Sequence, residues 1–564
     1  MTLLIEVPVM NDSMKKQLAC SLLTLTLCAV SLQAAATDET LIAQPDAAIA
    51  QTEAGKVQGF IHDGILTYRG IPYATARRFQ APEAARPWQG IRPALMYGNI
   101  CPQTGGNPLD NFMFSGPHLQ QSDDCLNLNV WTPSTTDGKH RPVMVWLHGG
   151  GFSNGSSIES YAYDGENLSR TGDVVVVSVN HRLNAMGHLD LSAYGEQYRH
   201  SANSGVLDLV AALQWVRANA AHFGGDPKNV TIFGESGGGA KVLTLMGTPA
   251  AKGLFHKAIV QSAALEGMGM TLLKPESTRR VAELTLQHLG IQPTELSRLD
   301  NLPYEQIAQA TQKALDETAQ EQKLPNIQGD GIGLAWAPAT DGDYIPEEPV
   351  GEKYPRIAKD IPLLIGSNLT EWNTIYAYFG DIDKAQRDNH HHWNAARTAV
   401  RIKERYGDRS DALNKAFAAA YPGRQAADVL FVDTFLRIPT LKTARIKAEQ
   451  GGAPVYNYLF TWGTPVLGGF AMSYHTSEIP FVMNSLALTE TANGNGAEAR
   501  ALASRMSGAW VAFARTGNPN TAALPKWPAY TPENGATMIF DNMPVVRYHH
   551  DAELLRLLKP NGRF

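Results

Sequence analysis

The fold of this chain is decided by Val230-Thr231-Ile232-Phe233-Gly234-Glu235-Ser236-Gly237-Gly238-Gly239-Ala240-Lys241-Val242-Leu243, in which an apolar, β-prone run stops at Gly-x-Ser-x-Gly and a helix-compatible run follows. This layout predicts a sharp turn between a strand and a helix, with Ser236 at its apex. Gly234 and Gly238 flank the turn because it strains the serine backbone, and a larger side chain there would collide with the adjoining strand or helix. The turn exposes Ser236 above the sheet edge at the positive end of a helix, so the sequence predicts a nucleophilic serine.

A second stretch of this glycine-rich chain also reads Gly-x-Ser-x-Gly. It is Gly151-Phe152-Ser153-Asn154-Gly155, in a sequence that holds 50 glycines. The residues that follow it, 156–159, do not predict a clear helix. The local context therefore favours Ser236 over Ser153 as the nucleophile.

The glycine run before Ser153 belongs to a different feature. Pro142-Val143-Met144-Val145-Trp146-Leu147 predicts a buried strand, and it leads directly into His148-Gly149-Gly150-Gly151-Phe152. Such a loop lets backbone N–H groups converge on one point without side-chain obstruction. Taken alone, it is equally well explained as a turn that passes close to a neighbouring segment. Together with Ser236, it predicts an oxyanion hole.

A catalytic serine needs a base, and the base needs an acid that orients it, so both are expected in loops after strands that follow the serine. Residues 361–366 predict a short apolar strand, and the loop after them carries Glu371. Residues 455–460 predict another strand, whose following loop contains His475. The chain has 16 histidines, and this one is distinguished by its place just ahead of Glu478-Ile479-Pro480-Phe481. The chain order serine, acid, histidine is that of the α/β-hydrolases.

The chain resembles the type B carboxylesterases, a family that includes bacterial para-nitrobenzyl-type esterases, animal carboxylesterases and cholinesterases. The resemblance rests on ordered sequence blocks that cover nearly the whole chain after the first 36 residues. Besides the segments above, the matching blocks are Gly70-Ile71-Pro72-Tyr73-Ala74, residues 123–130, Asn180-His181-Arg182-Leu183, Phe223-Gly224-Gly225-Asp226-Pro227, Gln261-Ser262 and residues 513–519. The resemblance implies an α/β-hydrolase fold, in which helices flank a central, mostly parallel sheet and further helices form cap insertions. It also implies hydrolysis of carboxylic esters through an acyl-enzyme.

The resemblance assigns a role to each matching site residue. Ser236 matches the nucleophile, His475 the general base and acid, and Glu371 the carboxylate that holds the imidazole in one tautomer. The backbone N–H groups that match the oxyanion hole are those of Gly150, Gly151 and Gly237. Three more residues match positions beside the catalytic centre: Glu235, Ser262 and Glu478. Ser262 matches a serine near the acid, while the two glutamates are interpreted either as an electrostatic contribution or as a salt-bridged structural pair.

Two residues depart from the family pattern at the predicted site. Gly237 stands where the family usually has alanine, and the missing methyl predicts extra room for bulky acyl groups beside the attacked carbonyl. Trp372 replaces the glycine that usually follows the acid. Its ring either narrows the gorge or packs outward, and the sequence leaves both interpretations open.

The first 36 residues predict a secretory signal peptide. Met14-Lys15-Lys16 is a basic start, residues 18–32 are apolar but too short to span a membrane comfortably, and Ala34-Ala35-Ala36 is a small-residue cleavage site. We therefore expect Met14 to be the start, and a secreted or periplasmic protein with no stable membrane insertion after cleavage. Residues 37–564 contain no linker, charge block or repeat, which predicts a single catalytic domain.

Two of the four cysteines leave with the predicted leader, so Cys101 and Cys125 remain. They match a pair that forms a disulfide in the related family, and an exported protein meets an oxidising environment. The alternative is a pair of reduced structural thiols.

Helix-prone, amphipathic segments lie between the predicted strands. They are residues 276–289, 304–318 and 395–420. In a hydrolase, such insertions form cap helices over the site, so we expect these segments there.

No cofactor, metal or nucleic-acid partner is predicted. The net charge of −6 and the lack of a basic stretch argue against nucleic acid. Residues 329–333, Gly-Asp-Gly-Ile-Gly, lack the flanking strand and helix that dinucleotide binding needs, and they predict a turn. In His390-His391-His392, three consecutive imidazoles cannot all face one ion on a helix or strand, so we expect a solvated face.

The sequence therefore favours an ester hydrolase with a small-molecule substrate and leaves the oligomeric state open. An amidase or carbamate hydrolase is the alternative, because the same triad attacks those carbonyls. A binding or adhesion module is the alternative from another class, as in relatives that have lost the nucleophile. The intact Ser236, His475 and glycine loop 149–151 argue against that class.

Overall fold

The computed structural model describes residues 40–104, 116–118, 120–266, 271–326, 332–377 and 387–560. The predicted leader, 1–36, lies outside the described residues, and so do residues 329–331 of the predicted turn.

A twelve-stranded sheet runs through the molecule in the order β1-β4-β5-β9-β11-β10-β12-β13-β14-β15-β16-β17. Its strands are β1 (Leu41–Ile42), β4 (Phe60–His62), β5 (Ile65–Pro72), β9 (Asn127–Thr132), β10 (Arg141–Leu147), β11 (Val175–Val179), β12 (Gly225–Glu235), β13 (Lys257–Gln261), β14 (Leu363–Asn368), β15 (Val455–Phe460), β16 (Ala536–Phe540) and β17 (Val545–Tyr548). Neighbours from β11 to β16 are parallel, and the pairs outside them are antiparallel. Two small sheets contain β2 (Ile49–Thr52), β3 (Gly55–Gln58) and β8 (Ile91–Pro93), and β6 (Ala74–Thr75) and β7 (Glu83–Ala84). The predicted central, mostly parallel sheet is confirmed.

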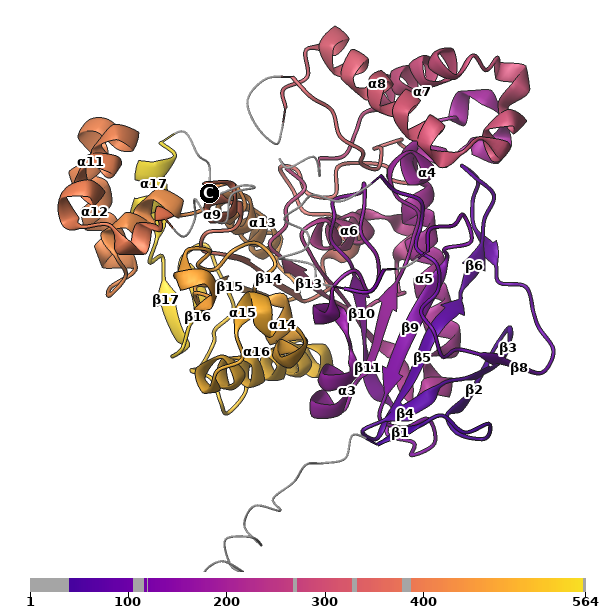
Figure 1. Cartoon of the computed structure of the whole chain (residues 1–564), viewed down its shortest axis with the longest axis horizontal. Coiled ribbons are helices and arrows are strands. Elements are labelled where there is room, and N and C mark those ends of the chain that lie inside the picture. The colour runs from indigo at the N-terminus through magenta and orange to yellow at the C-terminus, as the bar shows by residue number, and fades with distance from the viewer. Residues whose placement is uncertain are drawn as a thin grey trace, which may run out of the picture.

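Helices flank the sheet and extend beyond one of its ends (Figure 1). They are α3 (Glu166–Gly172), α4 (Asn184–His188), α5 (Ser204–Asn219), α6 (Gly237–Gly247), α7 (Pro275–Leu289), α8 (Tyr304–Gln322), α9 (Trp372–Ala377), α11 (Ala395–Tyr406), α12 (Ser410–Ala420), α13 (Arg437–Glu449), α14 (Ile479–Val482), α15 (Glu490–Asn493), α16 (Ala497–Thr516) and α17 (Ala552–Leu558). None of these helices, within the described ranges, is both long and apolar enough to cross a membrane.

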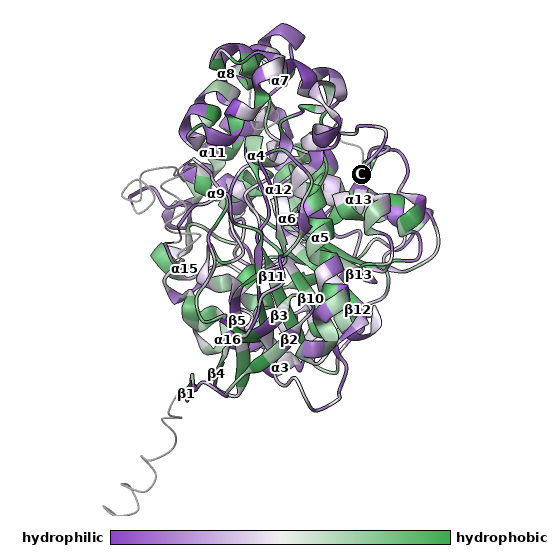
Figure 2. Cartoon of the chain, turned by 90° about the vertical axis from the view of Figure 1, so that its right-hand side faces the viewer, coloured by the Kyte–Doolittle hydropathy of each residue, from purple (hydrophilic) through white to green (hydrophobic). Residues whose placement is uncertain are grey.

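The central strands are mostly apolar because both faces of the sheet are covered. In β10, Val143, Val145 and Leu147 join the core shared with α5 and α6, while Met144 and Trp146 join the core shared with α3 and α16. Alternate side chains of a strand point to opposite faces, so in a strand buried on both sides most positions are apolar. Figure 2 shows this arrangement as hydrophobic residues in the central strands and many hydrophilic residues on α7 and α8.

The predicted cap segments separate into two groups in space. α7 and α8 pack against each other at the top of Figure 1, around a core that they share with α4 and the residues after it. Residues 395–420 form α11 and α12, divided at Gly407, and lie with α17 near the sheet edge at β16 and β17. The predicted cap position is therefore wrong for residues 395–420, because their apolar faces cover the edge of the sheet instead.

The predicted disulfide is confirmed. Cys101 and Cys125 are joined, with their Cα atoms 5.0 Å apart, and both side chains are buried. The bond ties the segment after β8 to the start of β9, so the alternative of two reduced thiols is wrong.

Candidate active site

Ser236 occupies the strained turn that the sequence predicts. It lies between β12 and α6 with φ 56° and ψ −124°, a backbone conformation that residues with side chains rarely adopt. A Cβ atom at Gly234 would lie 2.5 Å from the Leu147 carbonyl oxygen, and one at Gly238 would lie 1.9 Å from the same atom. Only glycine fits at either position, which confirms why the serine is flanked by glycines.

Ser153 lies in a different setting. Its backbone N–H donates to the Gly150 carbonyl at 3.2 Å, within a tight turn that no α-helix directly follows. Ser153 also lines a pocket of about 340 Å³ together with Asn184 and with Tyr304 of α8. The choice of Ser236 over Ser153 stays a prediction. The pocket places α8 next to the segment that follows the glycine loop.

His475 and Glu371 meet because β14 and β15 are parallel neighbours and their following loops lie side by side. His475 Nδ1 lies 2.7 Å from Glu371 Oε2, and the His475 backbone N–H donates to the Glu371 carbonyl at 3.0 Å. The other carboxylate oxygen, Oε1, accepts the Asn368 backbone N–H at 2.6 Å. Both the backbone and the carboxylate of Glu371 thus orient the imidazole.

Burial sets the protonation of this pair. Burial lowers the pKa of His475 to about 4, although the negative charges of Glu478 and Asp433 act to raise it. Burial raises the pKa of Glu371 to about 8, although the Asn368 N–H and the Ser262 hydroxyl act to lower it. Burial therefore disfavours a charge on either member of the pair. When Glu371 is a carboxylate, the single ring proton lies on Nδ1 and is donated to Oε2, which leaves His475 Nε2 able to accept a proton.

Glu235, the residue before Ser236, faces this nitrogen. Its Oε1 lies 3.2 Å from His475 Nε2, and within the described residues the Ser236 hydroxyl makes no hydrogen bond. Burial raises the pKa of Glu235 well above its ordinary value, and the negative charges of Glu478, Glu371 and Glu159 raise it further. A protonated Glu235 can donate a hydrogen bond to the unprotonated ring nitrogen.

Glu478 has amide partners. It accepts hydrogen bonds from Gln261 Nε2 at 3.1 Å and from Asn368 Nδ2 at 2.7 Å. In the described part of the chain, neither Glu235 nor Glu478 pairs with a lysine or arginine. Amides and an imidazole surround the two carboxyl groups instead, which favours the electrostatic interpretation over a structural pair with a lysine or arginine.

Trp372 covers the histidine. Its ring centroid lies 4.4 Å from that of His475, with the two planes inclined by 33°. The ring therefore packs on the imidazole, and outward packing is wrong. The sequence leaves the direction of this side chain open because it depends on how the two loops meet.

The glycine loop lies directly against the serine turn. Within the described residues, the N–H groups of Gly150, Gly151 and Gly237 donate to no protein acceptor, so three donors remain available near Ser236. A Cβ atom at Gly237 would lie 2.3 Å from the Gly151 carbonyl oxygen and 2.4 Å from its nitrogen. The predicted extra room for acyl groups is therefore wrong, because the Gly151 backbone already fills that space.

Lys241 is a residue of the site that the sequence analysis missed. It is buried in α6, and its Nζ donates to the carbonyls of His148 at 2.8 Å and Gly149 at 3.1 Å. Burial lowers its pKa from 10.5 to about 7, against the charge of Glu159. The C=O and N–H of one peptide unit point in opposite directions, so holding the Gly149 carbonyl sets the direction of the Gly150 N–H. The available signal was a lone charge in an otherwise apolar and small-residue helix.

The described residues contain two groups that could hold a metal ion, and neither includes a residue of the candidate active site. They are His390, His391 and Asp428, and His62, Asp63 and Glu166. His390 is fully buried, so the predicted solvated face is wrong for this residue.

Comparisons with known proteins agree on one family. The family described as "Carboxylesterase family" matches residues 46–556. A para-nitrobenzyl esterase of Bacillus subtilis (strain 168) is 36% identical over 520 residues, which cover 91% of this chain and 99% of that protein. Phenmedipham hydrolase of Pseudarthrobacter oxydans is 32% identical over 505 residues, which cover 87% of this chain and 94% of that protein. A solved esterase from Clostridium hathewayi, described as hydrolysing aliphatic aromatic polyesters, is 39% identical with a TM-score of 0.83, covering 93% and 99% of the two chains.

Proposed function

We propose that this chain works through an acyl-enzyme formed on Ser236. The proposal starts from the fact that the chain belongs to the carboxylesterase family and is a carboxylic ester hydrolase of the α/β-hydrolase fold. The observation that carries the proposal is the meeting of three features at one end of the sheet: the strained serine, the buried His475–Glu371 pair and the unused N–H groups of the glycine loop.

The site residues act in sequence in this reaction. His475 Nε2 accepts the hydroxyl proton of Ser236 while Oγ bonds to the ester carbonyl carbon. The N–H groups of Gly150, Gly151 and Gly237 stabilise the oxyanion, and Glu371 stabilises the imidazolium. The intermediate then expels the alcohol, which takes the proton from His475. Water repeats the sequence on the acyl-enzyme and releases the carboxylic acid.

The resting contact between His475 and Glu235 requires one adjustment before the reaction. Nε2 must exchange its 3.2 Å contact with Glu235 for one with Ser236. The two partners of Nε2 belong to consecutive residues, so a small movement of the ring is enough. Catalytic hydrogen bonds are often long without substrate and become shorter when it binds.

The test is a pair of serine variants. We expect Ser236→Ala to abolish hydrolysis of para-nitrophenyl acetate with the fold retained, and Ser153→Ala to keep it. A fluorophosphonate should label the peptide that contains Ser236. Loss of turnover in folded Ser153→Ala, or labelling of another peptide, would overturn the proposal.

Carbamate hydrolysis is the second candidate. It is favoured by the similarity to phenmedipham hydrolase, since phenmedipham is a carbamate. The proposed triad would attack a carbamate carbonyl in the same way, and nitrogen donation to that carbonyl makes the attack slower. A panel of para-nitrophenyl esters, aryl carbamates and anilides on the purified protein separates the ester, carbamate and amide activities.

We also propose that residues 37–564 are the mature catalytic chain, secreted or periplasmic. One sheet from β1 to β17 and one family match over 46–556 support a single domain, and the disulfide supports an oxidising compartment. Sequencing the N-terminus of the exported protein should give Thr37 as its first residue. Recovery of the full chain from the cytoplasm would contradict this.

A further inference from the structure

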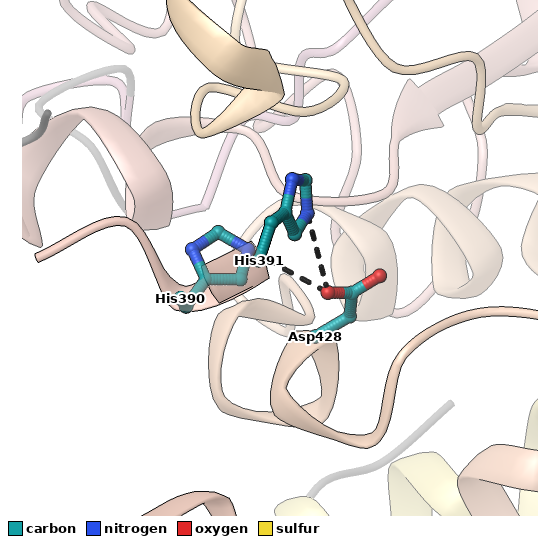
Figure 3. A group of neighbouring side chains, drawn as sticks. All are labelled: His390, His391 and Asp428. Carbon is teal, nitrogen blue, oxygen red and sulfur yellow. Dashed lines mark ion pairs between the residues drawn. The ribbon is translucent and has the colours of Figure 1, made fainter. Parts of the chain in front are cut away.

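The group His390, His391 and Asp428 lies where two short 3₁₀ helices meet, His390–His392 and Ala426–Phe431. Figure 3 shows both imidazole rings directed at one oxygen of the aspartate. Each Nε2 lies 3.5 Å from Asp428 Oδ1, and the three ligand atoms lie within 4.8 Å of one another. His390 and Asp428 are buried, whereas His391 is 25% exposed and opens the group to solvent.

The spacing is that of ligands around a small metal ion. Two ligands that bind tetrahedral Zn²⁺ at about 2.1 Å lie about 3.4 Å from each other. Both distances from Asp428 Oδ1 to the ring nitrogens match this value. The partly exposed His391 can close the remaining distance to His390 by rotating its side chain.

The carboxylate oxygen at the centre of the group lacks a short hydrogen bond. Within the described residues, Asp428 Oδ1 is buried and has no hydrogen-bond partner. The other oxygen faces Arg424 Nη1 at 3.7 Å, and this guanidinium also bonds to the Thr461 carbonyl and to Asp541. A buried charged oxygen whose nearest partners are two ring nitrogens at 3.5 Å is poorly stabilised, and a cation bound between the three groups would stabilise it better.

We propose that His390, His391 and Asp428 form a binding site for one divalent transition-metal ion of the Zn²⁺ type, with water as the fourth ligand. Two imidazoles and a carboxylate are ligands that Zn²⁺ takes readily. His392 is exposed and takes no part, so consecutive histidines do supply two ligands here, although three could not face one ion.

The ion would act on structure. The Phe431 ring lies 4.4 Å from the His390 ring, and the Phe431 carbonyl accepts a hydrogen bond from Asn373 Nδ2 at 3.1 Å. Asn373 follows Glu371 by two residues. An ion that joins the two 3₁₀ helices would therefore stiffen the support of the segment that carries Glu371.

The test measures binding of Zn²⁺ and Co²⁺ alone. After dialysis against a chelator, calorimetry with the purified chain should give one Zn²⁺ per chain, and Co²⁺ should give the visible absorption of a tetrahedral site. At a hundredfold excess over Kd, Zn²⁺ should raise Tm by about 2 °C. His391→Ala, which changes a partly exposed residue, and Asp428→Asn should both lose the ion, whereas the matched control His392→Ala should bind like the wild type.

Three results would overturn the proposal. The first is a wild-type chain that binds no ion. The second is a His391→Ala variant, folded by circular dichroism, that binds Zn²⁺ as tightly as the wild type. The third is binding that survives in His391→Ala and disappears in Glu166→Gln, which would place the ion at His62, Asp63 and Glu166.

Discussion

Replacing the buried amine of Lys241 by Lys241→Met separates its effect on catalysis from its effect on stability. Methionine has a similar length and no charge, so the variant keeps the packing of α6 and removes the two bonds to the carbonyls of His148 and Gly149. The Gly149–Gly150 peptide unit then loses the contact that fixes its direction. We expect the Gly150 N–H to be misdirected in the transition state.

The magnitudes follow from the geometry and the pKa. Complete loss of one oxyanion donor costs about 10²–10³ in kcat, so misdirection should cost about 10–100-fold with KM little changed. The folded amine of Lys241 has a pKa of about 7 against an ordinary value of 10.5. The unfolded chain therefore holds more protons between these values, and wild-type stability rises with pH there. From pH 7 to pH 10 this contribution is about 3–4 kcal/mol, and it is absent in Lys241→Met.

Two measurements compare Lys241→Met with the wild type. Steady-state kinetics with para-nitrophenyl acetate gives kcat and KM, and urea unfolding at pH 7 and pH 10 gives the stability difference. Lys447→Met is the matched control, because Lys447 is also buried and donates to a carbonyl, that of Lys359 at 2.7 Å, but lies on α13. Its pKa is lowered by burial to about 8, so we expect a smaller loss of pH dependence and an unchanged kcat.

The kcat and the pH dependence of stability test separate parts of the argument. A wild-type kcat in Lys241→Met, combined with the expected loss of pH dependence, would show that the amine is buried but does not orient the loop. An unchanged difference in stability between pH 7 and pH 10 would show that the amine is not a desolvated cation. An equal loss of kcat in Lys447→Met would refute the argument from geometry.

Glu371→Gln should lower kcat by about 10²–10⁴-fold with substrate binding retained, because an amide can hold the imidazole in the wrong tautomer. Saturation kinetics measures this. A kcat within tenfold of the wild type would assign the role to another carboxylate. Replacing Cys101 and Cys125 by alanine should lower the free energy of unfolding by about 3–4 kcal/mol on the chain-entropy model, measured by urea unfolding, since their separation is 24 residues. Gly237→Ala should lower kcat about tenfold or more for acetate and benzoate esters alike, because the added methyl displaces the Gly151 backbone. The control Gly508→Ala places a methyl in open space on α16, so it should leave the free energy of unfolding unchanged or raise it by up to about 1 kcal/mol. A loss confined to benzoate esters would support an acyl pocket at Gly237 instead.

Local patterns along the chain predicted individual strands and helices, while the resemblance to the family implied the fold. The strand at residues 455–460 and the start of the helix at residue 304 agree with the prediction, because continuous apolar runs and amphipathic periodicity report burial directly. The serine turn is also a local feature, since its strain requires glycine at both flanking positions. Residues 395–420 form helices as expected, yet their location depends on the apolar edge that they cover, which periodicity does not report.

Tertiary structure decided the details of the candidate site. Whether Gly237 opens a pocket depended on Gly151, and the partners of Lys241 were the carbonyls of another loop. The contact of Glu235 with His475, and the burial of His390, likewise join segments far apart in the chain. A sequence pattern reports which residues lie on one face of one element. It does not report which atoms of a distant loop fill the space opposite that face, because the packing of the whole domain determines those distances.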